Sequence, residues 1–159
     1  MTELWRIASD TPLYTSDDMT GKGAELTGGR WNRKGSAVVY TSKSIALACM
    51  ETIVHLGATT LPMNRFLVRI DVPDDVWARR RTATATSLPV GWTAEPSGRV
   101  SHDVGEAWLK DAGAPALLEV PSVIVPEEFN VLINPRHPDA AGIRATKLRP
   151  FQYDARLTI

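Results

Sequence analysis

The sequence has almost no cysteine, no long apolar run and no net charge. Cys49 is the one cysteine among 159 residues, which excludes an internal disulfide and a four-cysteine zinc site. No stretch approaches the roughly 18 apolar residues of a transmembrane helix, and the first residues lack an apolar segment of signal length. We therefore expect a soluble, cytoplasmic protein.

The charges balance, with 18 Lys plus Arg against 18 Asp plus Glu. Proteins that bind a nucleic-acid backbone usually carry a basic excess, and electrostatic docking to a membrane also needs one. We therefore expect no direct contact with nucleic acid or with a membrane. Thirteen of the 18 cations are arginines. This bias suits bidentate capture of phosphate or carboxylate, and a GC-rich genome would also produce it.

The length favours a single domain over residues 1–159, large enough to hold a core without disulfides. Short strands mixed with a few helices predict an α+β domain. The strands are too irregularly spaced for a doubly wound sheet, and neither common nucleotide-binding glycine motif is present. Strands are expected at 4–8, 37–41, 66–72, 117–125, 130–134 and 143–151, helices at 44–56 and 105–113, and irregular structure at 9–29 and 74–100.

The helix expected at 44–56 carries the first candidate site residue. It is apolar on nearly every side, which predicts a buried helix, and Glu51 is its only acidic residue. A carboxylate there must meet a cation or hydrogen-bond donors, or else face water. The sequence leaves open a cleft carboxylate with a functional role and a carboxylate on a narrow polar stripe with Ser44 and His55.

Two further candidates lie before that helix. Arg30 follows the pair Gly28-Gly29, a pattern that suits an arginine held over an anion and equally an ordinary glycine turn. Tyr40 ends an apolar run, where it could stack on a flat ring or be a core residue with a satisfied hydroxyl.

The remaining polar candidates are weaker by pattern alone. Ser122 interrupts an apolar strand and lacks the glycines of a hydrolase nucleophile motif, so it could simply fill space. Arg6 lies in the first strand, as a ligand-binding cation or an ion-pair partner. The run at 79–81 is three arginines, either a solvated face or a partner-binding patch. The three histidines show no metal-binding spacing with Cys49.

Five stretches taken together resemble the RES domain family, which is named for an Arg, a Glu and a Ser. Their order and spacing make the resemblance specific, and residues 74–104 match least. The stretches are LWRIA at 4–8, GGRWNRKG at 28–35, VVYTSKSIALACMETIVHL at 38–56, VPSVIVPEEFNVLINPRHP at 120–138 and PFQYDARL at 150–157.

The resemblance implies a fold similar to ADP-ribosyltransferases, with a split, mostly antiparallel sheet around an NAD⁺ cleft and short flanking helices. It identifies Arg30, Glu51 and Ser122 as the catalytic Arg, Glu and Ser of the family. Arg6 and Tyr40 fall where the family has further active-site residues. All five are therefore expected to contact NAD⁺.

The resemblance also implies a toxin of a bacterial toxin–antitoxin pair that cleaves the nicotinamide–ribose bond of NAD⁺. The ADP-ribose would pass to water, to phosphate or to a target protein, without a metal. The expected partner is an antitoxin with an Xre-type helix-turn-helix. The residues suit this chemistry, because a carboxylate can stabilise an oxocarbenium-like state and arginines can bind pyrophosphate. The alternative is a non-catalytic module of the same fold that binds a partner or a nucleotide.

Overall fold

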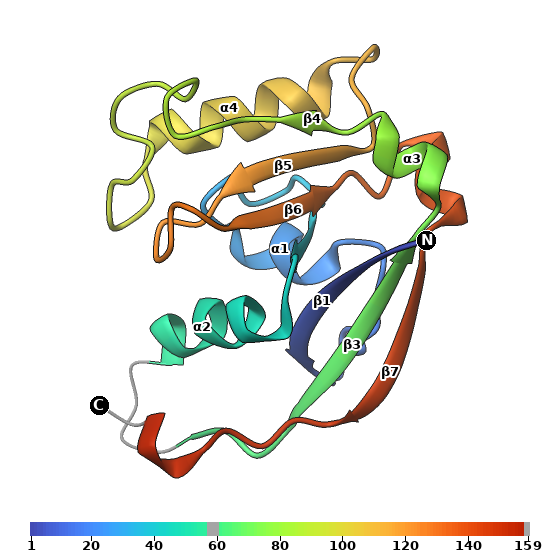
Figure 1. The fold of residues 1–159 in the computed structure, drawn as a ribbon, viewed down its shortest axis with the longest axis vertical. Helices are drawn as coiled ribbons and strands as arrows, with labels where there is room; N and C mark the ends of the chain where they lie inside the picture. Colours follow the sequence, from blue (N-terminus) through green and yellow to red (C-terminus); the bar gives the residue numbers. More distant parts are fainter. Residues whose placement is uncertain (57–60, 158–159) are drawn as a thin grey trace.

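The computed structural model describes residues 1–56 and 61–157, in which seven strands form one sheet (Figure 1). The strands are β1 (Thr2–Ser9), β2 (Val39–Ser42), β3 (Arg65–Val72), β4 (Arg81–Thr82), β5 (Leu117–Pro121), β6 (Phe129–Ile133) and β7 (Arg144–Pro150). The α-helices are α1 (Lys22–Thr27), α2 (Ile45–Leu56), α3 (Asp74–Ala78) and α4 (Arg99–Lys110), with short 3-10 helices at Pro138–Gly142 and Ala155–Leu157. The predicted α+β class is confirmed.

The sheet has the order β4-β5-β6-β2-β1-β3-β7, and only β4 and β5 are parallel. It is nearly divided between β1 and β2. In the described chain these strands pair at one position, Trp5 opposite Ser42, whereas β1 pairs with β3 from Thr2 to Ser9. Figure 1 shows β1, β3 and β7 running at a steep angle to β5 and β6. The predicted mostly antiparallel sheet is confirmed, and its two parts meet at Ser42.

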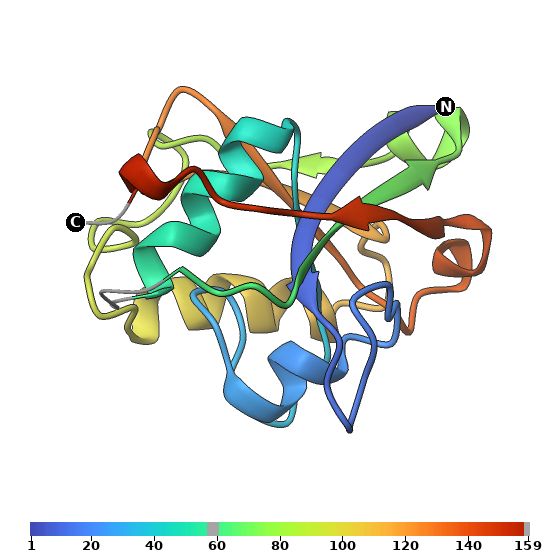
Figure 2. The ribbon, with the colours of Figure 1, turned by 90° about the horizontal axis from the view of Figure 1, so that it is seen from below.

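Buried side chains form three clusters around this sheet. One joins the strands on both sides of the division, includes Val39 and reaches α3. A second packs α4 on β5 and β6 and contains Trp31, Trp92 and Trp108. The third packs α2 on β1, β3 and the C-terminal segment, and Figure 2 shows that segment running beside α2. Helices α2 and α4 are thus each packed by a separate cluster.

Helix α2 is less buried than its composition predicts. Its start is as expected, because the Leu47 amide donates to Ser44 Oγ at 3.1 Å. Of its residues only Leu47 and Ala48 are buried, however, and Met50 and Val54 are 40% and 53% exposed. The expectation of a helix buried on all sides is wrong, because only one face of α2 packs on the sheet and the C-terminal segment.

The segments predicted to be irregular contain regular structure. Helix α1 lies within 9–29, and α3 and β4 lie within 74–100. Helix α4 begins at Arg99 and ends at Lys110, instead of covering 105–113. Val100, Val104 and Trp108 recur at helical spacing along its apolar face, while Ser101, Gly105 and Glu106 are buried beside them. The strand expected at 117–125 ends at Pro121, and the strand expected at 37–41 begins at Val39.

Helix α4 makes a close backbone contact with the segment that carries Arg30. A Cβ atom at Gly105 would lie 1.7 Å from the carbonyl oxygen of Trp31. The neighbouring Glu106 accepts hydrogen bonds from the Arg33 amide and the Ser36 hydroxyl, both at 2.9 Å. Helix α4 therefore fixes the chain on both sides of the predicted arginine.

We expect Gly105→Ala to lower the free energy of unfolding by about 3 kcal/mol, because backbone must move to admit the methyl group. Chemical denaturation measures this change. Gly142→Ala is the matched control, since a Cβ there meets Pro73 at an ordinary 3.6 Å, and we expect a change within about 0.5 kcal/mol. Equal effects of the two substitutions would contradict the close contact.

Candidate active site

Glu51 is held by two neutral hydrogen-bond donors. The Ser122 hydroxyl and the Asn130 side-chain amide each donate to Glu51 Oε1 at 2.7 Å. Among the described residues no cation forms an ion pair with Glu51, and its other carboxylate oxygen receives no hydrogen bond. The structure thus presents an oriented carboxylate whose charge is not neutralised by the protein.

Both donors are themselves fixed by other groups. Ser122 is 1% exposed, and its oxygen also accepts from the Ile124 and Val125 amides at 3.1 and 3.2 Å. The Ser42 hydroxyl donates to Asn130 Oδ1 at 2.7 Å, which turns the amide nitrogen of Asn130 toward Glu51. Because Ser42 also stands at the joint between β1 and β2, the orientation of Glu51 is tied to the division of the sheet.

Tyr40 lies two residues before Ser42, so both side chains face the same side of β2. Its hydroxyl accepts from the Trp31 amide at 3.0 Å and donates to Asn32 Oδ1 at 2.6 Å. A Cβ at Gly29 would lie 2.7 Å from this hydroxyl, which explains the need for glycine there. Burial raises the pKa of Tyr40 well above its ordinary value, although the Trp31 amide opposes the shift. Tyr40 therefore stays neutral and orders the turn that carries Arg30.

Arg30 is mostly buried and faces the loop before α4. Nη1 donates to the carbonyl oxygens of Trp92 and Ala94 at 3.0 and 2.8 Å, and Nη2 donates to Glu95 Oε2 at 2.7 Å. Trp92 in turn stacks on Trp31, with ring centroids 6.2 Å apart. Of the two alternatives that the sequence left open, the structure favours an arginine that is held in place, by two carbonyl oxygens and a carboxylate.

Arg6 is a part-buried cation with incomplete hydrogen bonding. Nη2 donates to the carbonyl oxygens of Ser16 and Asp18 at 2.5 and 2.7 Å. Within the described residues Arg6 Nε and the buried Ser16 hydroxyl have no hydrogen-bond partner. Burial lowers the pKa of Arg6, and the charges of Asp18 and Asp17 oppose the shift. Buried polar atoms without partners are rare, so these two atoms are candidates to bind a ligand or an ordered water.

A cavity of about 200 Å³ lies where β1 and β2 diverge. Arg6 and Ala8 line it from β1, Val39 and Tyr40 line it from β2, and residues between Tyr14 and Ala24 close it. It therefore joins two of the predicted site residues with the partnerless Arg6 Nε and with Ser16. Arg30, Glu51 and Ser122 lie outside its lining and connect to it through Tyr40 and β2.

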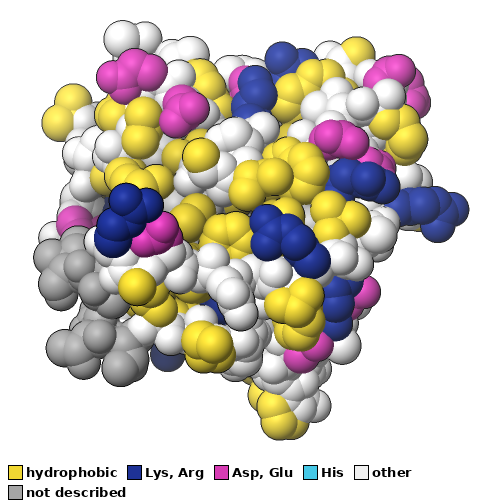
Figure 3. Space-filling view, turned by 60° about the horizontal axis from the view of Figure 1, so that its bottom comes forward, with side chains coloured by type: hydrophobic (Ala, Val, Ile, Leu, Met, Phe, Trp, Pro, Cys, Tyr) yellow, Lys and Arg dark blue, Asp and Glu magenta, His cyan; other side chains and the backbone are white. Residues whose placement is uncertain are grey.

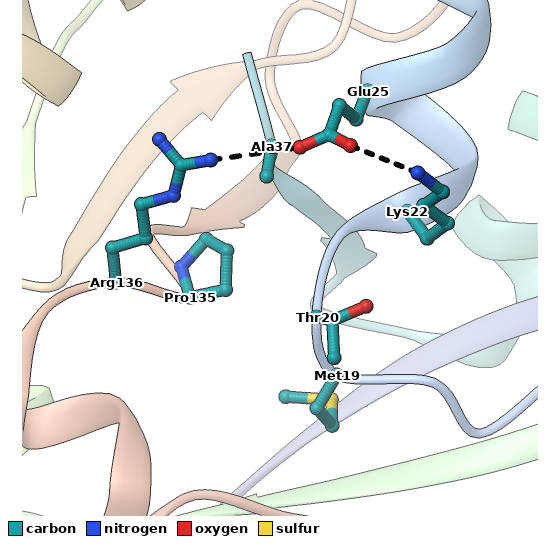
Figure 4. Close-up of a pocket in the computed structure, with 7 residues that line it drawn as sticks. All are labelled: Met19, Thr20, Lys22, Glu25, Ala37, Pro135 and Arg136. Carbon is teal, nitrogen blue, oxygen red and sulfur yellow. Dashed lines mark hydrogen bonds and ion pairs between the residues drawn. The ribbon is translucent and has the colours of Figure 1, made fainter. Parts of the chain in front are cut away.

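A second hollow, of about 370 Å³, contains none of the predicted site residues (Figure 4). Its charged groups satisfy one another, because Glu25 pairs with Lys22 at 3.2 Å and with Arg136 at 3.6 Å. The segment 18–25 contributes different residues to the two hollows, so it forms part of the lining of both. The smaller cavity is the better candidate for a ligand site.

The structure brings the predicted residues together in two groups along β2. Glu51 and Ser122 touch directly, whereas Arg30, Tyr40 and Arg6 are linked by the Tyr40 hydroxyl and the cavity. Sequence reasoning missed Asn130, Ser42 and Ser16. Asn130 is the first residue of the strand expected at 130–134, and it lies within the stretch at 120–138 that carries the family resemblance. A polar side chain at that position could therefore have been recognised as a candidate site residue.

The arginines at 79–81 are not a free basic patch. Arg79 pairs with Asp75 and Asp139, while Arg80 pairs with the buried Glu119 and stacks on Trp77. On the face shown in Figure 3, cations and carboxylates lie side by side with apolar side chains between them.

The described residues contain no cluster of three or more His, Cys, Asp or Glu able to hold a metal. No described helix is long and apolar enough to cross a membrane.

Comparison with known proteins identifies the class to which this fold and site belong. The RES domain family matches residues 3–154. The chain is 57% identical to the Prs ADP-ribosylating toxin of Sphingobium sp. (strain YBL2) over 98% of this chain and 96% of that protein. It is 36% identical to Toxin Res of Pseudomonas putida over 97% and 98% of the two chains, and 34% identical to Toxin Res of Yersinia enterocolitica over 91% and 93%. The chain belongs to the RES domain family, as its motifs predicted.

We expect Tyr40→Phe to lower the free energy of unfolding by about 1–3 kcal/mol at pH 8, because the Trp31 amide and Asn32 lose their partner. The deficit should shrink as the pH rises past about 10. Above that pH the tyrosine at position 40 ionises in the unfolded wild type, while Tyr40 in the folded protein stays protonated. Ionisation stabilises the unfolded wild type, so the free energy of unfolding falls in the wild type and not in Tyr40→Phe.

Urea denaturation at pH 8 and pH 10.5 measures both effects. Tyr14→Phe is the matched control, since the Tyr14 hydroxyl has no hydrogen bond among the described residues; we expect little change from it at pH 8. A deficit of Tyr40→Phe that is constant with pH would contradict the buried, neutral phenol.

Proposed function

We propose that this chain is a toxin that cleaves the nicotinamide–ribose bond of NAD⁺ and transfers the ADP-ribose to a protein. One observation carries the proposal: among the described residues neither the Glu51 carboxylate nor the Arg6 guanidinium has an ion-pair partner. NAD⁺ offers the complementary charges, an anionic pyrophosphate and a ribose that becomes positive as the bond breaks.

Glu51 would stabilise the reacting ribose. The Oε1 atom is occupied by Ser122 and Asn130, which leaves Oε2 to accept a ribose hydroxyl or to face the developing positive charge. Because two neutral donors orient the carboxylate without neutralising it, its full charge is available to the transition state. Ser122 and Asn130 then act as positioning residues. Ser122 would contribute by orienting Glu51 and not, as expected from the family resemblance, by contacting NAD⁺ itself.

Arg6 and Arg30 would bind the anionic part of NAD⁺. Arg6 Nε and the Ser16 hydroxyl need partners that a phosphate oxygen supplies. Arg30 stands beside Tyr40 in a turn fixed by α4, so its position is set before the substrate arrives. The neutral Tyr40 ring borders the cavity, where it can pack on the nicotinamide.

A protein acceptor is favoured by the relatives. The Sphingobium protein is named for ADP-ribosylating Prs, and the 57% identity extends over 98% of this chain. We therefore propose Prs as the acceptor here as well, with water or phosphate as the alternatives.

We propose that the reaction uses no metal, because the Glu51 carboxylate and the guanidinium groups of Arg6 and Arg30 supply the charges that it needs. By the toxin names of its relatives we also propose an antitoxin partner with an Xre-type helix-turn-helix.

We expect Glu51→Gln to reduce nicotinamide release by at least about 100-fold, because glutamine keeps the shape but removes the charge. Glu127→Gln is the control, since Glu127 is exposed and we expect it to keep full activity. Released nicotinamide is measured by chromatography after incubation with NAD⁺. Full release by the Glu51→Gln protein would exclude this mechanism, and no release by the wild type would favour a non-catalytic binding module.

We expect label from ADP-ribose-labelled NAD⁺ to appear on purified Prs after incubation with the wild-type chain. The Glu51→Gln protein should leave Prs unlabelled, which separates enzymatic transfer from chemical attachment. Gel autoradiography of the protein and chromatography of the supernatant together account for the label. Label found solely in free ADP-ribose or its phosphate would replace the protein acceptor with water or phosphate.

A further inference from the structure

The hydrogen bonds of Arg30 divide into a fixed set and an exchangeable one. Nη1 is bound by two backbone carbonyl oxygens, of Trp92 and Ala94, whereas Nη2 is bound by the side chain of Glu95. The two partners of the ion pair also differ in exposure. The Arg30 side chain is 17% exposed and the Glu95 side chain is 75% exposed.

The carbonyl partners cannot leave easily. Trp92 is 6% exposed and stacks on Trp31, so the loop at this point belongs to the core. Backbone hydrogen bonds also close the loop, from the Trp92 amide to Pro89 and from the Ala94 amide to Gly91. These contacts set the position of the guanidinium, and they do so with neutral groups that leave its charge in place.

The Glu95 carboxylate is held differently. Arg30 is its one hydrogen-bond and ion-pair partner among the described residues, and most of its surface faces solvent. A carboxylate and a phosphate bind a guanidinium with the same donor geometry, so each can replace the other. An ion pair with one exposed partner is worth little, and rotation of the Glu95 side chain into water therefore needs little free energy.

We propose that Glu95 is an internal counter-ion of Arg30, which the anionic group of the substrate displaces on binding. This proposal rests on the proposed function and deepens it. In the free protein Glu95 neutralises Arg30, and in the bound protein a phosphate oxygen takes the place of Glu95 Oε2 while the carbonyl contacts of Nη1 persist. Glu95 thus lowers the affinity for NAD⁺ without taking part in bond cleavage.

The test measures NAD⁺ binding apart from turnover. In a Glu51→Gln background, tryptophan fluorescence reports ligand binding, because Trp92 lies against the Arg30 site. We expect the further substitution Glu95→Gln to lower the Kd about two- to five-fold, the range that such ion pairs are worth. Glu95→Asp, which shortens the side chain and weakens the pair, should fall between the wild type and Glu95→Gln.

In the catalytically intact chain, Glu95→Gln should lower the KM for NAD⁺ by the same factor and leave kcat unchanged. The matched control is Asp103→Asn. It breaks another exposed ion pair, between Asp103 and Arg33, and Arg33 lies in the same segment of the chain as Arg30. We expect Asp103→Asn to leave both constants unchanged.

Affinity that is unchanged or weaker in Glu95→Gln, with an unaltered melting temperature, would overturn the proposal. A lower kcat at constant KM would also overturn it, since Glu95 would then position Arg30 for the reaction. These outcomes are separate from failure of the proposed function. That failure would be nicotinamide release by Glu51→Gln at the wild-type rate, whatever Glu95 does to binding.

Discussion

The site depends on one joint in the sheet, where Ser42 of β2 stands opposite Trp5 of β1. Beyond this joint the two strands separate, and the cavity lined by Arg6 and Tyr40 occupies the space between them. The Ser42 side chain, at the same position, orients Asn130 and through it Glu51. The backbone that opens the sheet and the hydrogen bonds that aim the carboxylate therefore share a residue.

The joint also explains how opposite charges can stand unpaired in one small domain. Glu51 lies on α2 and Arg6 on β1, and no ion pair joins either of them to another described residue. Each is held by neutral groups, hydroxyl and amide donors for the carboxylate and carbonyl oxygens for the guanidinium. Holding a charge without neutralising it is expensive in a folded protein, and it is the condition for a charge to act on a ligand.

The parts of the fold that apolar patterns encode were predictable from the sequence. The strands around Val39, Val68 and Val131 and the start of α2 at Ser44 follow local rules of composition and capping. The start of α4 was misplaced although Val100, Val104 and Trp108 have helical spacing, because Gly105 and Glu106 are buried against the segment of Trp31 and Arg33, a contact that local patterns do not reveal. Local patterns singled out the five candidate residues and the family resemblance gave them their roles. The positioning role of Asn130 depends on pairing between distant strands, which no local rule supplies.

Zero net charge gave little information about function until the pairs were known. Most cations on the chain, such as Arg79 and Arg80, form ion pairs with carboxylates close to them. Arg30 is an intermediate case, positioned by carbonyl oxygens and neutralised by an exposed carboxylate. In the displacement that we propose, Glu95 leaves Arg30, and the guanidinium becomes available to an anionic group of the substrate. A net charge of zero is compatible with anion binding, because the sum of charges does not say which cations are paired with exposed carboxylates.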